Sequence, residues 1–443
     1  MLRKSVGLMM SIFILFWSST VWSKVYIDIN APGFQKYPIA VTDFKNIGTT
    51  DDRENLSVWF SYQLSRYLKL TGFFNVINKG AFLEDPEQAG ITIEGINFSD
   101  WSTIGADFLI KGGFDSDGKA LSAEFRIFDV VEGRLIVGKR YEDTMEKRKL
   151  MVLKFIDEIL LALTGERGVF NTRIAFVAKD RDVSEIYTIN FDGTDLIKRT
   201  RLESLTMFPQ WSPDGRQIFF TSYLNGNPDS YIMNLETKRV REVTSFRGLN
   251  MASAWSPDGS KLLLVLSRDG NEEIYVKDVK DVENGGLRRL TNNPAIDVSP
   301  TWSPDGSMIA FVSNRSGSPQ IFTMDSDGRG TSRLTYEGSY NTSPSWSPRG
   351  KRIAYEGATN GRFQIFSIDD DGGNFVQLTF ERGGGESPSW SPGGMYVTFV
   401  STIDGKKKIC IINSNGLNLR VLGSPGRSFS LDSPSWSPRL NLY

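Results

Sequence analysis

The stretch Trp302-Ser303-Pro304-Asp305-Gly306 contains a tripeptide, Trp-Ser-Pro, that this chain repeats six times. The copies lie 44 to 47 residues apart and begin at Trp211, Trp255, Trp302, Trp346, Trp390 and Trp436. A repeat of this length is typical of a propeller whose blades have four strands each. The spacing therefore predicts a β-propeller over more than half of the chain.

Each repeat has the residues that a turn between two strands requires. In Ser303-Pro304-Asp305-Gly306, proline presets φ at the second position of a type I turn, and glycine is favoured at the fourth. Two apolar runs, 309–313 and 320–324, follow as strands. We expect the tryptophan before each turn to fill the space between neighbouring blades, because a buried indole covers a large apolar area.

The two ends of the repeat array complement one another. Arg173-Ile174-Ala175-Phe176-Val177 matches a second strand, yet no Trp-Ser-Pro precedes it. Trp436 begins the last copy, but no strand sequence follows it. The C-terminal segment is therefore expected to supply the missing strand of the N-terminal blade. The predicted fold is an N-terminal α/β domain followed by a six-bladed β-propeller closed by the C-terminal strand, which leaves no open edge.

Residues 24–165 lack the repeat and are predicted to form the α/β domain, with the propeller over 166–443. A helix is expected to start at a capping box, Asp51 with Glu54, and to end at Gly72. A second helix, Met145 to Leu163, is apolar over most of its surface and should pack against two surfaces. Alternation and turn residues predict strands over 25–29, 37–44, 73–77, 107–111, 121–131 and 134–141.

The first 23 residues are interpreted as a signal peptide. Arg3 and Lys4 form a basic n-region, and an apolar stretch of signal-peptide length, 6–17, follows them. Small residues precede Lys24, where cleavage is expected. An uncleaved membrane anchor is the alternative. The mature protein is expected to be soluble and exported.

Composition excludes several classes of function. The chain has no histidine and a formal net charge of −1, so neither His-dependent catalysis nor nucleic-acid binding is expected. The single cysteine, Cys410, lies in an apolar strand pattern and is interpreted as a buried thiol. The residues indicate no cofactor.

Two stretches carry a resemblance to a known family: Leu163–Val177, at the expected domain junction, and Leu290–Gly306, in the propeller. Together with the exported α/β domain, the six repeats and the C-terminal Pro434-Ser435-Trp436-Ser437-Pro438, they make nearly the whole chain resemble the TolB family, the periplasmic components of Tol-Pal systems.

The resemblance implies a non-enzymatic periplasmic adaptor, monomeric and peripheral to the outer membrane. It would bind the lipoprotein Pal over the propeller channel and TolA through its mature N-terminus, supporting outer-membrane integrity and cell division. Family members often carry histidine at two places that hold Leu153 and Leu249 here. Hydrogen bonds from those imidazoles are therefore absent.

The residues four places before each tryptophan are predicted to surround one mouth of the channel. They are apolar in the first three copies and polar or acidic in the last three: Met207, Met251, Val298, Thr342, Glu386 and Asp432. Structural variation alone could give this pattern, and so could a partner that binds off-centre. The predicted Pal-binding face comprises Met207, Leu249, Asn250, Met251, Asp297, Val298, Thr342 and Glu386.

The predicted TolA-binding segment is Lys24, Val25, Tyr26, Ile27, Asp28, Ile29 and Asn30. The alternating pattern fits an edge strand of the first domain. It also fits a detachable strand that pairs with a partner's main chain. Both interpretations stay open, since one segment can be docked in one state and free in another.

Two other functions remain as alternatives. The first is a propeller enzyme with a carboxylate-bound metal in the channel, for which Asp297 and Glu386 are the candidate ligands. The second is a scaffold for some other periplasmic partner.

Overall fold

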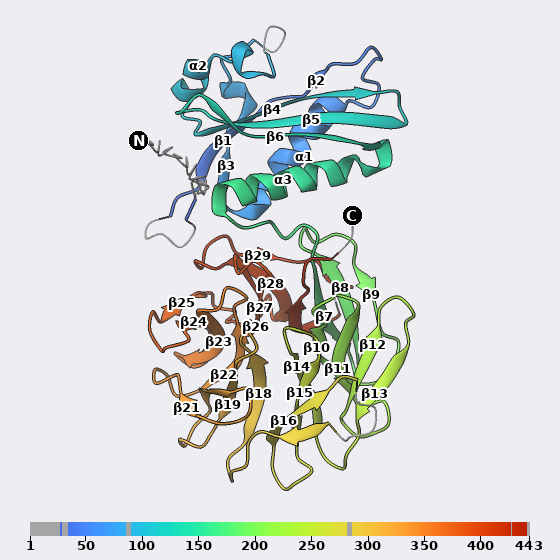
Figure 1. Cartoon of the computed structure of the whole chain (residues 1–443), viewed down its shortest axis with the longest axis vertical. Helices are drawn as coiled ribbons and strands as arrows, with labels where there is room; N and C mark the ends of the chain where they lie inside the picture. The colour runs from blue at the N-terminus through green and yellow to red at the C-terminus, as the bar shows by residue number, and fades with distance from the viewer. Residues whose placement is uncertain (1–26, 29–33, 86–89, 281–285, 427, 441–443) are drawn as a thin grey trace, which may run out of the picture.

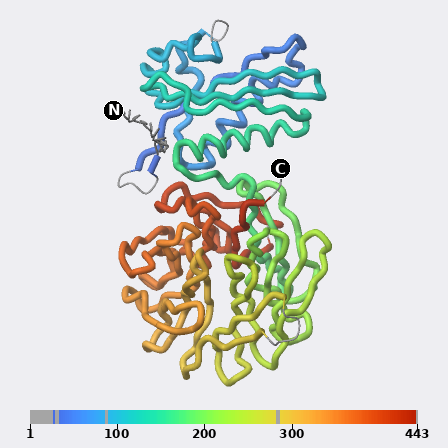
Figure 2. Tube along the Cα trace, in the orientation of Figure 1, coloured from blue at the N-terminus to red at the C-terminus, as the bar shows by residue number. Residues whose placement is uncertain are grey.

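The computed structural model describes residues 27–28, 34–85, 90–280, 286–426 and 428–440. Two parts are stacked along the long axis of the molecule, with an α/β part above a β-propeller (Figure 1). The chain passes through the α/β part first and then runs around the propeller (Figure 2). The predicted two-part fold is confirmed. None of the helices in the described part of the chain is both long and apolar enough to cross a membrane.

The first part is built on a six-stranded sheet in the order β3-β1-β4-β5-β6, with β2 beside β4. The strands β1, β3 and β4 are parallel, whereas β4, β5 and β6 form an antiparallel meander. The strand bounds are β1 Tyr37–Val41, β2 Lys45–Asn46, β3 Phe74–Val76, β4 Phe108–Ser116, β5 Ala120–Asp129 and β6 Arg134–Thr144.

Two long helices cover one face of this sheet, α1 (Leu56–Thr71) and α3 (Arg148–Thr164). The short helix α2 (Phe98–Thr103) lies on the other face, where Trp101 is buried. Three 3-10 turns complete this part: Lys79–Ala81, Ile93–Gly95 and Met145–Lys147. The prediction for α3 is confirmed, because its buried side chains share one apolar core with the sheet and with the propeller.

The predicted capping box at the start of α1 is wrong. The carboxylate of Asp52 accepts the backbone N–H groups of Leu56, at 2.6 Å, and Ser57, at 2.9 Å. A carboxylate that accepts the first free N–H groups of a helix caps it, so Asp52 takes this role and Asp51 does not. The far end is as predicted, because Gly72 has a φ of 78°, which L-residues with a Cβ avoid.

The strand predicted over 25–29 is wrong for the two of its residues that the structure describes. Neither Ile27 nor Asp28 is in a strand. The Ile27 N–H donates to the Leu163 carbonyl at the end of α3, at 2.8 Å, and the Ile27 side chain is buried. The remaining residues from Lys24 to Asn30, like the signal peptide, lie outside the described residues.

The second part has six four-stranded sheets, which we call blades 1 to 6. Blade 1 consists of β10 Thr206–Trp211, β11 Gln217–Ser222, β12 Asp229–Asn234 and β13 Val240–Thr244. Blade 2 consists of β14 Asn250–Trp255, β15 Lys261–Leu266, β16 Glu273–Asp278 and β17 Leu287–Arg289, and blade 3 of β18 Asp297–Trp302, β19 Met308–Ser313, β20 Gln320–Asp325 and β21 Ser332–Arg333.

Blade 4 consists of β22 Asn341–Trp346, β23 Arg352–Thr359, β24 Arg362–Asp369 and β25 Val376–Gln377. Blade 5 consists of β26 Glu386–Trp390, β27 Tyr396–Ile403, β28 Lys406–Asn413 and β29 Arg420–Val421, and blade 6 of β30 Ser430–Trp436, β7 Arg173–Asp180, β8 Val183–Asn190 and β9 Ile197–Lys198.

The first strand of each blade ends in the repeated tryptophan, and we call these six strands the channel strands. Trp211 of blade 1 donates its indole N–H to the Ser435 carbonyl of blade 6, at 3.1 Å. Trp390 does the same to Ser345 of the preceding blade, also at 3.1 Å. These two indoles join neighbouring blades by hydrogen bonds, and Trp302 does so by packing in one apolar cluster with Leu263 and Ile274 of blade 2, in agreement with the predicted place of the tryptophans.

The ring closes between the two ends of the propeller sequence. Channel strand β30 pairs antiparallel with β7, and blade 6 has the order β30-β7-β8-β9. Leu431 lies opposite Ala178, and Trp436 lies opposite Ile174. Closure by the C-terminal strand is confirmed.

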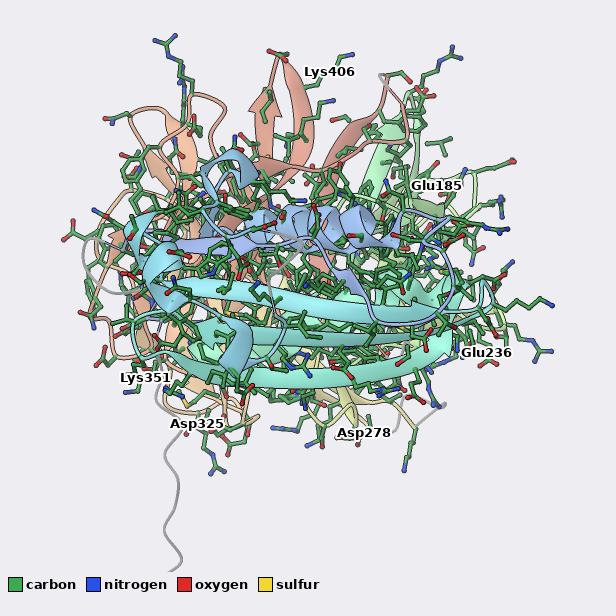
Figure 3. All side chains as sticks on the ribbon, turned by 90° about the horizontal axis from the view of Figure 1, so that it is seen from above. Glu185, Glu236, Asp278, Asp325, Lys351 and Lys406 are labelled. Atoms are coloured by element: carbon green, nitrogen blue, oxygen red, sulfur yellow. The ribbon has the colours of Figure 1, made fainter. Side chains whose placement is uncertain are left out.

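The first part packs against the end of the propeller that carries the Trp-Ser-Pro turns, which we call the proximal end. The Tyr67 hydroxyl donates to Asp192 of blade 6, at 2.9 Å, and Lys149 lies 3.3 Å from the same carboxylate. Tyr396 of blade 5 donates to the Thr71 carbonyl at 3.2 Å. Seen along this direction, the first sheet crosses in front of the ring, and the blades follow one another from Glu185 through Glu236, Asp278, Asp325 and Lys351 to Lys406 (Figure 3).

Deleting residues 431–443 should lower the stability of the chain by several kcal/mol, because β7 becomes an open edge and the Trp436 indole leaves the core. Denaturant unfolding of the truncated and full chains measures this difference. Truncation after Leu440 is the control, since it keeps β30 and the Leu440 N–H bond to the Asn171 carbonyl. An unchanged unfolding transition in the 431–443 deletion would contradict closure by β30.

Candidate functional site

The propeller has a second end, opposite the proximal end, where all the contacts of the first part given above lie. Each channel strand runs from this end to its tryptophan at the proximal end, over six residues in blade 1, or about 17 Å. The loops that precede the channel strands and the turns between second and third strands lie here. We call this end the distal face.

The predicted site residues four places before each tryptophan lie at the distal start of the channel strands. They are half-buried in all six blades. Met207, Met251 and Val298 occupy adjacent blades 1, 2 and 3, whereas Glu386 and Asp432 occupy adjacent blades 5 and 6. The structure thus places the apolar group on one side of the channel mouth and the acidic pair on the other, with Thr342 between them.

A lysine that the sequence did not point to lies between the two acids. Lys407, on β28, places its ammonium 2.5 Å from Glu386 and 3.4 Å from Asp432. Burial alone would lower the pKa of Lys407, but the two carboxylates outweigh it and raise that pKa. The acidic side of the mouth is therefore partly neutralised by the protein itself.

Asn250 and Asp297, two predicted contact residues, are fully buried. The Asn250 amide bonds to the main chain of its own loop at Phe246 and Gly248, and Asp297 holds Arg315 at 2.7 Å. The strand period explains this, because the residue five places before the tryptophan faces inward when the fourth faces the mouth. The expectation that these two side chains face a partner, or that Asp297 reaches into the channel, does not fit their burial. The Asn250 and Asp297 side chains instead hold the distal loops from within the blades.

A cavity of about 180 Å³ lies in the channel just below the distal mouth. Blades 1 and 2 line it with the apolar residues Phe208, Met251, Ala252 and Ala254, together with Gln210 and Ser253. Blades 3 to 6 contribute most of the hydroxyl groups, beside four prolines: Ser299, Thr301, Ser343, Ser345, Ser387, Ser389 and Ser433, with Pro300, Pro344, Pro388 and Pro434. The cavity can therefore receive a group with both apolar and polar atoms.

All six channel strands shift register at this level, and five of them share one backbone form. The residue three places before the tryptophan is left-handed there, and a proline follows it: Phe208, Ser299, Ser343, Ser387 and Ser433 have φ between 49° and 54°. A proline fits at the bulge because it donates no ladder hydrogen bond. Blade 2 differs, with Ala252-Ser253-Ala254 and no proline.

The distal face also exposes aromatic side chains that the sequence analysis missed. Tyr336 and Phe380, in the loops before β22 and β26, are 72% and 74% exposed. Tyr223, Leu224, Ile296 and Tyr340 are exposed on the same face. These six residues belong to distal loops between blade 1 and blade 5, and exposed apolar side chains on one face are typical of a protein-binding site. Loop position alone gave no sign that these residues stay exposed.

A repeated threonine holds the start of several distal loops, and it could have been found from its spacing. Leu290-Thr291, Leu334-Thr335 and Leu378-Thr379 recur every 44 residues. Each threonine hydroxyl accepts the N–H of an isoleucine in the third strand of its blade, at 2.8 to 2.9 Å. The start of each of these distal loops is therefore attached to the third strand of its blade by a side-chain hydrogen bond.

The described residues contain no group of three or more His, Cys, Asp or Glu side chains placed to hold a metal ion. Of the two candidate metal ligands, Asp297 is paired with Arg315 and Glu386 with Lys407.

Comparison with known proteins agrees with this architecture. The family model described as "TolB beta propeller domain" matches residues 161–440, and "TolB amino-terminal domain" matches residues 25–136. The chain belongs to the TolB family. The curated relatives include the "Tol-Pal system protein TolB" of Syntrophus aciditrophicus, 49% identical over 219 residues, and that of Desulfosudis oleivorans, 40% identical over 214 residues.

These alignments span 48% of the chain in both cases, and 48% and 49% of the two relatives. The chain thus spans about half the length of the curated relatives it matches. The crystal structure of TolB from Acinetobacter baumannii superposes with a TM-score of 0.79 and 27% identity. That superposition covers 91% of this chain and 97% of the other, so both parts of the fold are shared with that structure.

Asn250→Ala and Asp297→Ala should each lower the free energy of unfolding by about 1–3 kcal/mol, because each leaves buried polar partners unpaired. Denaturant unfolding of the two variants measures the loss. Ser253→Ala, at a half-buried position of the same channel strand as Asn250, is the matched control and should change stability little. Wild-type stability in both variants would mean that the loops do not depend on these side chains.

Proposed function

We propose that this chain is a non-enzymatic adaptor of a Tol-Pal system in the periplasm, and that its distal face binds the lipoprotein Pal. The observation that carries the proposal is the apolar side of the distal mouth in a chain of the TolB family. Through Pal the protein is peripheral to the outer membrane, and it supports outer-membrane integrity and cell division. We expect it to act as a monomer that has reached the periplasm through a signal peptide.

The form of the distal face supports binding by a protein partner. Half-buried Met207 and Met251 share the distal face with exposed aromatic rings, and methionine adapts its shape to a partner's surface. Aromatic side chains supply much of the energy of protein interfaces. The cavity below the mouth adds a recess that one projecting side chain of Pal can enter.

The same geometry disfavours the alternative of a metal-dependent propeller enzyme. Both of its candidate ligands already hold cationic side chains, Arg315 and Lys407. A carboxylate that is paired in this way must lose its partner before it can bind a metal ion. Adaptor function needs no such rearrangement.

Met251→Glu combined with Val298→Glu should weaken binding of the periplasmic domain of Pal by at least about tenfold, or about 1.4 kcal/mol, because two charges lose water at an apolar contact. Isothermal titration calorimetry measures the affinity, and circular dichroism verifies the fold. Phe375→Glu with Leu417→Glu is the matched control, since both residues are exposed in turns at the proximal end and should leave the affinity unchanged. Wild-type affinity in the Met251/Val298 variant would end this assignment of the face.

We further propose that TolA binds the segment from Lys24 to Asn30. Ile27 supports a docked state, since its N–H bonds to Leu163 and its side chain lies in the core shared with α3. We propose that the segment leaves this position to pair with a partner, and that Pal binding shifts the balance between the docked and the free state.

Ile27→Glu should increase deuterium uptake over residues 24–33, because a charge at this buried position undocks the segment. Hydrogen–deuterium exchange with mass spectrometry measures the uptake in the full chain, with and without Pal. Val131→Glu, at an exposed apolar residue after β5, is the control. Uptake that is the same with and without Pal in the wild-type chain would contradict coupling between the two sites.

A further inference from the structure

One carboxylic acid at the distal mouth stands where the other blades have a neutral residue. Glu356, on β23, lies opposite Thr342 in the ladder of blade 4. The same register position is threonine in blade 1 and valine in the others: Thr221, Val265, Val312, Val400 and Val177. Glu356 is only 8% exposed, so a carboxyl group replaces a small side chain inside the wall of the channel.

Glu356 holds the channel strand of the next blade. Its Oε2 accepts the N–H of Ser387, at 3.1 Å, and Ser387 is the left-handed residue of the β26 bulge. Thr221 makes the equivalent bond to the Ala252 N–H, at 2.8 Å, between blades 1 and 2. Glu356 is therefore a positioning residue for the part of the mouth that bears Glu386.

Two charged groups act on Glu356 from the elements around it, Glu386 on β26 and Lys407 on β28, and Lys407 also contacts Asp432 on β30. Burial is the main reason why the pKa of Glu356 is raised to about 7, and the Glu386 carboxylate adds to it. The Ser387 N–H and Lys407 act in the opposite direction. The side chains of Glu386 and Asp432 are still in contact with solvent, since they are 32% and 43% exposed.

We propose that binding of Pal at the distal mouth is coupled to uptake of a proton by Glu356, so that the affinity rises as the pH falls. This inference rests on the proposed function. A partner over the mouth removes water from the surroundings of Glu356 and Glu386, and the loss of water disfavours the charged form of a carboxyl group. The neutral acid keeps a carbonyl oxygen for the Ser387 N–H, so the bulge is held in both states.

The sign of the effect follows from linkage. If covering the mouth raises the pKa of Glu356, the complex binds more protons than the free protein does, and lower pH favours the complex. A rise of about one pKa unit on binding makes the affinity about fivefold higher at about pH 6 than at about pH 8.

The test is calorimetric titration of the full chain with the periplasmic domain of Pal between about pH 6 and pH 8, in two buffers with different ionisation enthalpies. The wild-type chain should take up protons and bind about fivefold tighter at the lower pH. Glu356→Gln, which keeps an acceptor for the Ser387 N–H, should lose most of this pH dependence. Glu236→Gln, at an exposed residue of the proximal end, is the matched control and should keep the wild-type slope.

A second variant, Glu356→Thr, copies the residue of blade 1 and serves if the Gln variant does not fold. Without Pal, these variants should gain stability over the wild type as the pH rises from about 5 to 8. The reason is that the raised pKa makes ionisation of Glu356 destabilise the native state in that range.

A wild-type affinity independent of pH, or an unchanged slope in the variants, overturns the inference and leaves the proposed function intact. Absence of Pal binding at every pH overturns both.

Discussion

The rest of the structure depends on the pairing of β30 with β7, which joins two segments that lie about 250 residues apart in the chain. Without it, the six blades would form an open arc with two free strand edges. The residues just after β30 also bind the linker that leads out of α3. The Arg439 guanidinium donates to the Arg167 carbonyl at 2.8 Å, and the Leu440 N–H donates to Asn171. The contact that closes the ring therefore also fixes the first part against the propeller.

The two ends of the propeller differ because they meet different surroundings. At the proximal end, Phe191, Tyr396 and Trp436 share one apolar core with α1 and α3, so packing against the first part occupies that surface. At the distal face, Tyr336 and Phe380 remain largely exposed, although the Arg333 guanidinium lies over the Tyr336 ring, 4.8 Å from its centroid. Buried groups such as Asn250 and the repeated threonines bind the distal loops from within the blades. A fixed surface with exposed apolar side chains suits recognition with little ordering entropy to overcome.

Much of this fold could be predicted from the sequence, because repeats and apolar periodicity are local signals. The tryptophan spacing predicted the blades, and the two incomplete ends of the array predicted the closure. The site was harder, because facing and exposure depend on tertiary register. Asn250 and Met251 are neighbours in sequence, yet one is buried and the other lines the mouth. Lys407 meets Glu386 only through the folding of blade 5, and Ile27 finds its partner at Leu163, on a distant helix.

Three departures from the repeat lie at the distal mouth and distinguish its sides. The tryptophan recurs in every blade, whereas its turn varies, since Asp305 of blade 3 corresponds to Arg349 in blade 4 and to Gly393 in blade 5. Phe208 in place of serine, Ala252-Ser253 without proline, and Glu356 in place of valine each alter one side of the channel only. Phe208 adopts a left-handed backbone that a bulky residue avoids, and such strain persists where the surroundings impose it. A six-fold scaffold thus acquires one apolar and one titratable side, as a partner that binds off-centre requires.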